Sequence, residues 1–157
     1  MRKSLFVVTL AAVATLGLRA PLLAEEGSDQ QLGTVHFATS CNETAQRRFD
    51  RAMRYQHSFW CAESRDIYQQ ALQADPQCAI AYWGIALSLL NNPHNPVPAP
   101  NLPLGLAAIN KAKAIGAGTP RERDYIDALA VMYVDFDKTS HQARVQPSLE
   151  RSLRVAA

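Results

Sequence analysis

Apolar residues recur along most of the chain at three- and four-residue intervals, which is the period of amphipathic α-helices. No segment shows the sustained alternation of apolar and polar residues that a half-buried strand requires. The pattern therefore predicts an all-α protein. The expected helices cover residues 44–58, 62–74, 77–90, 104–115 and 119–137.

Capping residues indicate where three of these helices begin. Ser40 with Glu43 has the spacing of a capping box, and Thr119 with Glu122 repeats it ahead of the last helix. Asp75, followed by a proline, predicts the start of the third helix, with the proline in the first helical position. The region between the third and fourth helices is rich in proline and asparagine, so we expect a loop there.

The first 24 residues have the outline of a secretory signal peptide. A basic start precedes an uncharged apolar run from Ser4 to Leu18, and Ala24 is a small residue suited to cleavage ahead of Glu25. The run of about 15 residues is short for a membrane span, which needs about 20, so we expect no stable membrane insertion after cleavage. An uncleaved anchor is the alternative. The expected location is periplasmic or secreted, where disulfides form.

Two segments beside the helices lack a sustained period. Residues 25–39 are mostly polar and are expected to form an extended leader. Residues 138–157 are poorly patterned, and a truncated form of a longer repeat protein is one interpretation of this segment. The helical repeats are expected to span residues 40–137.

Two units of the helical region are similar to each other at a separation of 34 residues. Ala52 and Ala86 have this spacing, as do Tyr55 and Leu89. Further small, aromatic and proline positions of the first unit are Ser64, Tyr68, Ala71 and Pro76. In these positions the chain resembles the tetratricopeptide repeat (TPR) family, over about residues 44–133. The resemblance implies antiparallel helix pairs stacked as a short TPR-like α-solenoid.

A more extensive resemblance is to exported bacterial TPR proteins of unassigned activity. It rests on short segments distributed along the chain. These are HFATSC at 36–41, HSFW at 57–60, DPQCA at 75–79, AYWG at 81–84 and RERDYI at 121–126.

In TPR stacks the first helix of each pair lines a concave surface, so the resemblance implies a concave binding face for a protein or peptide partner. Its expected residues are Phe49, Met53, His57, Trp83, Leu87, Leu90, Tyr125 and Leu129. Two interpretations of this apolar surface stay open. It holds an apolar peptide or partner helix with Trp83 as the anchor, or it is covered by missing downstream repeats or by the leader.

The three cysteines allow one disulfide and one remaining thiol. In a stack of helix pairs, Cys41 and Cys78 lie at the same end of neighbouring parallel helices. Cys61 lies beyond the other end of the first helix, roughly 20 Å away at 1.5 Å per residue. A disulfide needs Cα atoms within about 7 Å, so Cys41 is expected to pair with Cys78. Three free thiols are the alternative.

Charge and motifs narrow the classes of function. The chain has 16 Lys and Arg against 14 Asp and Glu, and three of the basic residues lie in the predicted signal peptide, so nucleic-acid binding is not expected. No phosphate-binding loop, zinc-protease motif or nucleophile elbow occurs, and we expect no enzyme, no cofactor and no metal. The favoured function is a non-catalytic binding scaffold in the cell envelope. The alternative is a redox- or metal-linked periplasmic accessory protein that uses Cys41, Cys61, Cys78 and His57.

Overall fold

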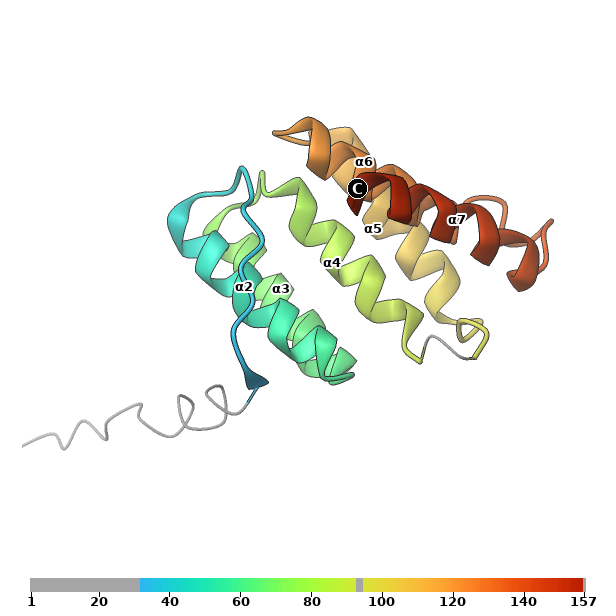
Figure 1. The fold of residues 1–157 in the computed structure, drawn as a ribbon, viewed down its shortest axis with the longest axis horizontal. Helices are drawn as coiled ribbons and strands as arrows, with labels where there is room; N and C mark the ends of the chain where they lie inside the picture. Colours follow the sequence, from blue (N-terminus) through green and yellow to red (C-terminus); the bar gives the residue numbers. More distant parts are fainter. Residues whose placement is uncertain (1–31, 93–94, 157) are drawn as a thin grey trace, which may run out of the picture.

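The computed structural model describes residues 32–92 and 95–156, and these residues form α-helices and no strand (Figure 1). The all-α prediction is confirmed for this part of the chain. The helices are α2 (Glu43–His57), α3 (Cys61–Ala74), α4 (Ala79–Leu90), α5 (Asn101–Ile115), α6 (Pro120–Ala130) and α7 (His141–Ala156). None of them is both long enough and apolar enough to span a bilayer. The predicted signal peptide at 1–24 lies outside the described residues, as does the start of the leader.

Consecutive helices pack as antiparallel pairs. The pairs are α2 with α3, α4 with α5, and α6 with α7, and further contacts of α3 with α4 and of α5 with α6 join one pair to the next (Figure 1). This arrangement is consistent with an α-solenoid. The first helices of the pairs, α2, α4 and α6, are neighbours in space, because α4 contacts both of the others.

Two glycines allow close approach between the helices. A Cβ atom on Gly84 of α4 would overlap the ring of Tyr68 from α3, and one on Gly105 of α5 would overlap the ring of Tyr133. Both tyrosine rings are fully buried. The Tyr133 hydroxyl donates to the carbonyl of Ala86 in α4, so its one polar atom is satisfied inside the core. The same close packing of a glycine against a tyrosine ring thus joins α3 to α4 and joins the turns after α6 to α5.

The predicted helix starts are partly right. Thr119 caps α6 as expected, since its hydroxyl accepts from the Glu122 amide at 3.1 Å. The capping box at Ser40 is wrong, because α2 is capped by Asn42. The Asn42 side chain accepts from the Ala45 amide at 2.9 Å, whereas Ser40 bonds to the carboxylate of Glu122. Ser40 therefore makes a tertiary contact with Glu122 and does not cap α2.

The prediction that Asp75 starts the third helix is also wrong. Asp75 follows the end of α3, and its carboxylate accepts from the Gln77 amide at 3.1 Å. This local bond holds a turn, and α4 begins only at Ala79. At the other end of the proline-rich loop, α5 begins at Asn101, before the expected start at Leu104, because a proline is tolerated in the first turn of a helix.

The C-terminal part differs most from the sequence pattern. α6 ends at Ala130 instead of about residue 137, and turns follow it. Residues 141–156, for which the apolar pattern predicts no helix, form α7 and complete a third pair. Pro147 inside α7 and a sparse apolar stripe, most of it exposed, explain why the helical period is hard to detect.

The segment that precedes α2 is extended and forms neither a helix nor part of a sheet. We call residues 33–40 the strap. They have no helical or strand structure, and the strap runs in front of α2 before the chain turns into that helix (Figure 1).

Candidate functional site

One side chain of the strap, Phe37, fills an apolar pocket formed by three helices. The centroid of its ring lies 5.7 Å from that of Phe49 in α2, 6.5 Å from that of Trp83 in α4 and 5.3 Å from that of Tyr125 in α6. We call these three residues the aromatic box. The guanidinium of Arg121 lies 4.3 Å from the centroid of the Phe37 ring, which is a cation–π contact. Phe37 is only 8% exposed, so it is the main apolar anchor of the strap.

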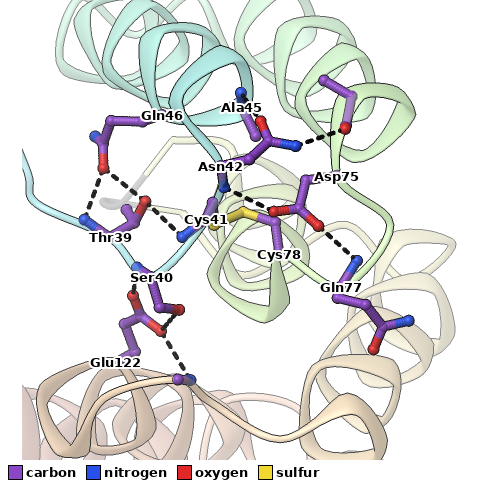
Figure 2. Close-up of a disulfide and its surroundings, with 12 residues drawn as sticks. Thr39, Ser40, Cys41, Asn42, Ala45, Gln46, Asp75, Gln77, Cys78 and Glu122 are labelled. Atoms are coloured by element: carbon purple, nitrogen blue, oxygen red, sulfur yellow. Dashed lines mark hydrogen bonds between the residues drawn. A yellow bond between two sulfur atoms is a disulfide. The ribbon is translucent and has the colours of Figure 1, made fainter.

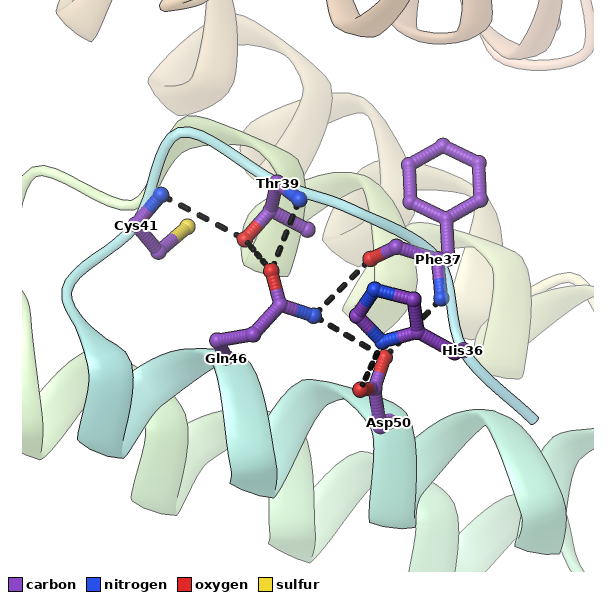
Figure 3. A network of polar contacts seen from close by, with 6 residues as sticks. All are labelled: His36, Phe37, Thr39, Cys41, Gln46 and Asp50. Carbon is purple, nitrogen blue, oxygen red and sulfur yellow. Dashed lines mark hydrogen bonds and ion pairs between the residues drawn. The ribbon is translucent and has the colours of Figure 1, made fainter. Parts of the chain in front are cut away.

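Two side chains of α2 bind the main chain of the strap (Figure 3). The Asp50 carboxylate accepts from the Phe37 amide at 3.0 Å. The Gln46 side chain donates to the Phe37 carbonyl at 2.8 Å and accepts from the Thr39 amide at 2.7 Å. Gln46 also donates to Asp50 at 2.9 Å, which holds the two side chains in register with the strap. The same Gln46 oxygen also accepts from the Thr39 hydroxyl at 2.6 Å. The contacts of Gln46 and Asp50 described here therefore go mainly to the extended main chain of the strap.

His36 adds a contact at the solvent side of this network. Its Nδ1 atom lies 2.7 Å from the second carboxylate oxygen of Asp50 (Figure 3). The imidazole side chain is 68% exposed, against 20% for the carboxylate. An ion pair at that exposure contributes little to stability, so the aromatic box and the main-chain bonds carry most of the binding of the strap.

The end of the strap is anchored by a buried carboxylate from α6. Glu122 is 0% exposed and accepts hydrogen bonds from both the amide and the hydroxyl of Ser40 (Figure 2). It also accepts from the Gly118 amide at 3.1 Å. A buried carboxylate needs such donors to offset the loss of hydration. Glu122, which the sequence predicts as the capping-box partner of Thr119, thus joins two segments that are 82 residues apart.

A disulfide follows the strap directly. Cys41 and Cys78 are bonded, with Cα atoms 4.9 Å apart, which confirms the predicted pair. Beside it the Asn42 amide donates to Asp75 at 2.8 Å, so the start of α2 is joined to the start of α4 by a covalent bond and to the end of α3 by a polar contact (Figure 2). A disulfide in a folded domain is typical of an oxidising compartment.

Beyond the aromatic box, the same faces of α4 and α6 remain open. The residues that follow Trp83 and Tyr125 at helical spacing contribute to an apolar groove of about 260 Å³ that α7 borders. We call this the open groove. Its apolar lining consists of Leu87, Leu90, Val97, Leu129, Met132, Val145 and Leu149. Leu149 is 50% exposed, so the groove presents large apolar side chains to solvent.

The structure divides the predicted binding residues into separate groups. Phe49, Trp83 and Tyr125 come together, but they form the aromatic box that Phe37 covers. The expected anchor Trp83 is therefore not an exposed residue, since only 7% of it is accessible. Three other predicted residues, Leu87, Leu90 and Leu129, are among those that line the open groove.

The other two predicted residues lie apart from both groups. The Met53 sulfur accepts from the Tyr68 hydroxyl at 2.8 Å, so this side chain packs between α2 and α3. His57 is exposed at the last position of α2. Of the two interpretations of the apolar surface, coverage by the leader holds for the aromatic box, and the open groove is left uncovered in the described residues.

Sequence reasoning misses the residues that hold the strap, which are Phe37, Gln46, Asp50, Arg121 and Glu122. A single signal points to the strap, namely Phe37 as a lone aromatic residue in a polar stretch. The polar partners carry no signal of their own, because Gln46 and Asp50 have ordinary positions on the polar side of an amphipathic helix.

The residues of the redox or metal alternative do not converge. Cys41 and Cys78 are bonded to each other and offer no free thiol. Cys61 is a buried free thiol at the start of α3. Burial raises the pKa of the Cys61 thiol above its ordinary value, in part offset by the nearby Arg65, and a protonated thiol is a weak nucleophile. Within residues 32–92 and 95–156, no group of three or more His, Cys, Asp or Glu side chains is arranged to hold a metal ion.

Comparisons with family models, with curated proteins and with solved structures find no match for this chain. The function must therefore be argued from the site.

Proposed function

We propose that this protein is a non-catalytic helical-repeat scaffold of the tetratricopeptide kind, exported to the cell envelope, that binds an extended peptide segment of a partner protein. The binding surface is the side formed by α2, α4 and α6. The disulfide supports export, because such bonds persist in oxidising compartments.

One observation carries the proposal, namely that this surface holds an extended peptide segment already. Gln46 and Asp50 bond three main-chain groups of the strap, and an aromatic side chain of the same segment fills a pocket. Main-chain bonds give affinity for an extended segment and side-chain pockets give selectivity, which is the usual division in peptide recognition.

The open groove extends this surface and supplies room for a partner. It is apolar, about 260 Å³ in volume, and lined by half-exposed side chains such as Leu149. The expected occupant is an extended segment with apolar side chains, because the neighbouring part of the surface holds a segment of that kind in the strap.

Selection from a random peptide display library on the purified wild-type protein tests the proposal. A selected peptide is then titrated against Leu149→Asp and against the matched control Leu153→Asp. Both leucines are exposed on α7, at 50% and 62%, but only Leu149 lines the groove. We expect Leu149→Asp to weaken binding at least tenfold and Leu153→Asp to leave it unchanged. If no peptide is selected, or if the two variants bind alike, the proposal is wrong.

A further inference from the structure

We infer that the strap occupies a peptide-binding site and can be displaced from it. The competing ligand is an extended segment with an aromatic side chain, and the strap competes with it in cis. This inference rests on the proposed function and goes beyond it, because it names the ligand class and a mode of regulation. The incoming segment would place its aromatic ring in the aromatic box and its main chain against Gln46 and Asp50.

The contacts of the strap are of a kind that another segment can reproduce. The bonds from Gln46 and Asp50 go to the amide and carbonyl of Phe37 and to the amide of Thr39. Any extended peptide offers these groups at the same spacing. The side chains beside Phe37 add two contacts to the same residues of α2. The Thr39 hydroxyl donates to Gln46 at 2.6 Å, and the exposed His36 lies 2.7 Å from Asp50. A segment that lacks these two side chains still offers every main-chain group that Gln46 and Asp50 bind.

The aromatic box determines which side chain fits. Phe49, Trp83 and Tyr125 surround a planar ring, with centroid distances from 5.3 to 6.5 Å. Arg121, itself exposed, lies over the ring and favours an occupant with an electron-rich face. Tryptophan has the most favourable face for such a contact, so a tryptophan-bearing segment is expected to compete better than one with phenylalanine.

The attachment of the strap allows release from one end only. At its C-terminal end the chain is fixed by the disulfide of Cys41 and by the bonds from Ser40 to Glu122. Toward its N-terminal end, residues 33 and 34 are exposed and Val35 is partly buried. Displacement therefore consists of the release of residues 33–39 while Cys41 stays in place. The disulfide and the helix packing are retained.

Titration with a peptide in trans tests the exchange. The probe is an acetylated and amidated peptide with the sequence of residues 33–40, and it is titrated by calorimetry against the full chain and against the full chain with Phe37→Ala. We expect the Phe37→Ala chain, whose aromatic box is vacant, to bind the probe at least tenfold more tightly than the wild type. The control Phe59→Ala removes an exposed phenylalanine between α2 and α3 and should bind the probe as the wild type does.

Two probe variants identify the contacts. A peptide with alanine in place of its phenylalanine should bind no chain, and one with tryptophan there should bind more tightly than the parent. Adding Gln46→Leu to the Phe37→Ala chain should weaken binding at least tenfold. Equal binding of the parent peptide and its alanine variant would overturn the inference.

Native-state hydrogen exchange on the wild type tests displacement even if Phe37→Ala fails to fold. The Phe37 and Thr39 amides, which donate to Asp50 and Gln46, should exchange at least tenfold faster than the buried helical amides of α2, through a local opening that does not respond to denaturant. Exchange of these two amides only by global unfolding would overturn the inference. The proposed function fails separately, since it requires the wild type to bind selected peptides at the open groove.

Discussion

The disulfide offers the clearest quantitative prediction. It joins Cys41 to Cys78, which are 37 residues apart, and the cross-link therefore restricts a loop of that length in the unfolded chain. In the chain-entropy treatment, a loop of 37 residues corresponds to a stabilisation of about 4 kcal/mol at 25 °C. Since domains of this size are stable by about 5–15 kcal/mol, the loss would be a large share of the total.

The perturbation is Cys41→Ala together with Cys78→Ala, because alanine avoids placing a hydroxyl at the buried position of Cys78. Urea unfolding followed by far-UV circular dichroism should show a free energy of unfolding lower by about 4 kcal/mol. The m-value should rise, because the unfolded chain without the cross-link exposes more surface.

Reductant provides the internal control. It should destabilise the wild type toward the value of the double variant and leave the double variant unchanged. Cys61→Ala should keep the sensitivity to reductant, since this thiol is free. A difference below about 1 kcal/mol between the oxidised wild type and the double variant would refute the reasoning, because the unfolded chain would then be restricted without the bond.

Three further substitutions or conditions test the fold. Gly84→Ala should destabilise the protein by about 1–3 kcal/mol in thermal melts, because its Cβ overlaps the buried ring of Tyr68. Glu122→Gln should cost about 1–3 kcal/mol and accelerate hydrogen exchange of the Ser40 amide, since the amide group cannot accept all the bonds of the carboxylate. Burial raises the pKa of Tyr68 and Tyr133, so the folded state holds these protons more tightly than the unfolded state does. The contribution of these two protons to the free energy of unfolding is complete below the ordinary tyrosine pKa of about 10. Above that pH it falls by about 1.4 kcal/mol per pH unit for each tyrosine. In alkaline urea titrations, Tyr133→Phe should therefore halve the slope of the free energy of unfolding against pH.

The sequence predicts those features that depend on local pattern. The helical period identifies α2 to α6, because each buries an apolar stripe against a neighbour. The pairing of Cys41 with Cys78 follows from the positions of both residues at the starts of parallel helices. The first inference needs only local spacing, and the second needs in addition the stacked helix pairs that the repeat resemblance implies.

The strap and the caps beside it depend on distant partners, and the sequence does not predict them. Phe37 is buried because Phe49, Trp83 and Tyr125 meet around it, and they come from three different helices. Ser40 has the spacing of a cap, but the carboxylate of Glu122 competes for it successfully. Local rules fail where a tertiary contact offers a better hydrogen-bond partner.

The bond from Ser40 to Glu122 has a consequence for the order of assembly during synthesis. A chain made from its N-terminus presents both disulfide cysteines well before Glu122 emerges, so the start of α2 can be joined to that of α4 first. The strap gains its final anchor, and Tyr125 of the aromatic box, only once α6 has folded onto α4. An unfinished chain therefore carries an unsecured N-terminal segment beside an incomplete pocket, and closure of the strap marks the docking of α6.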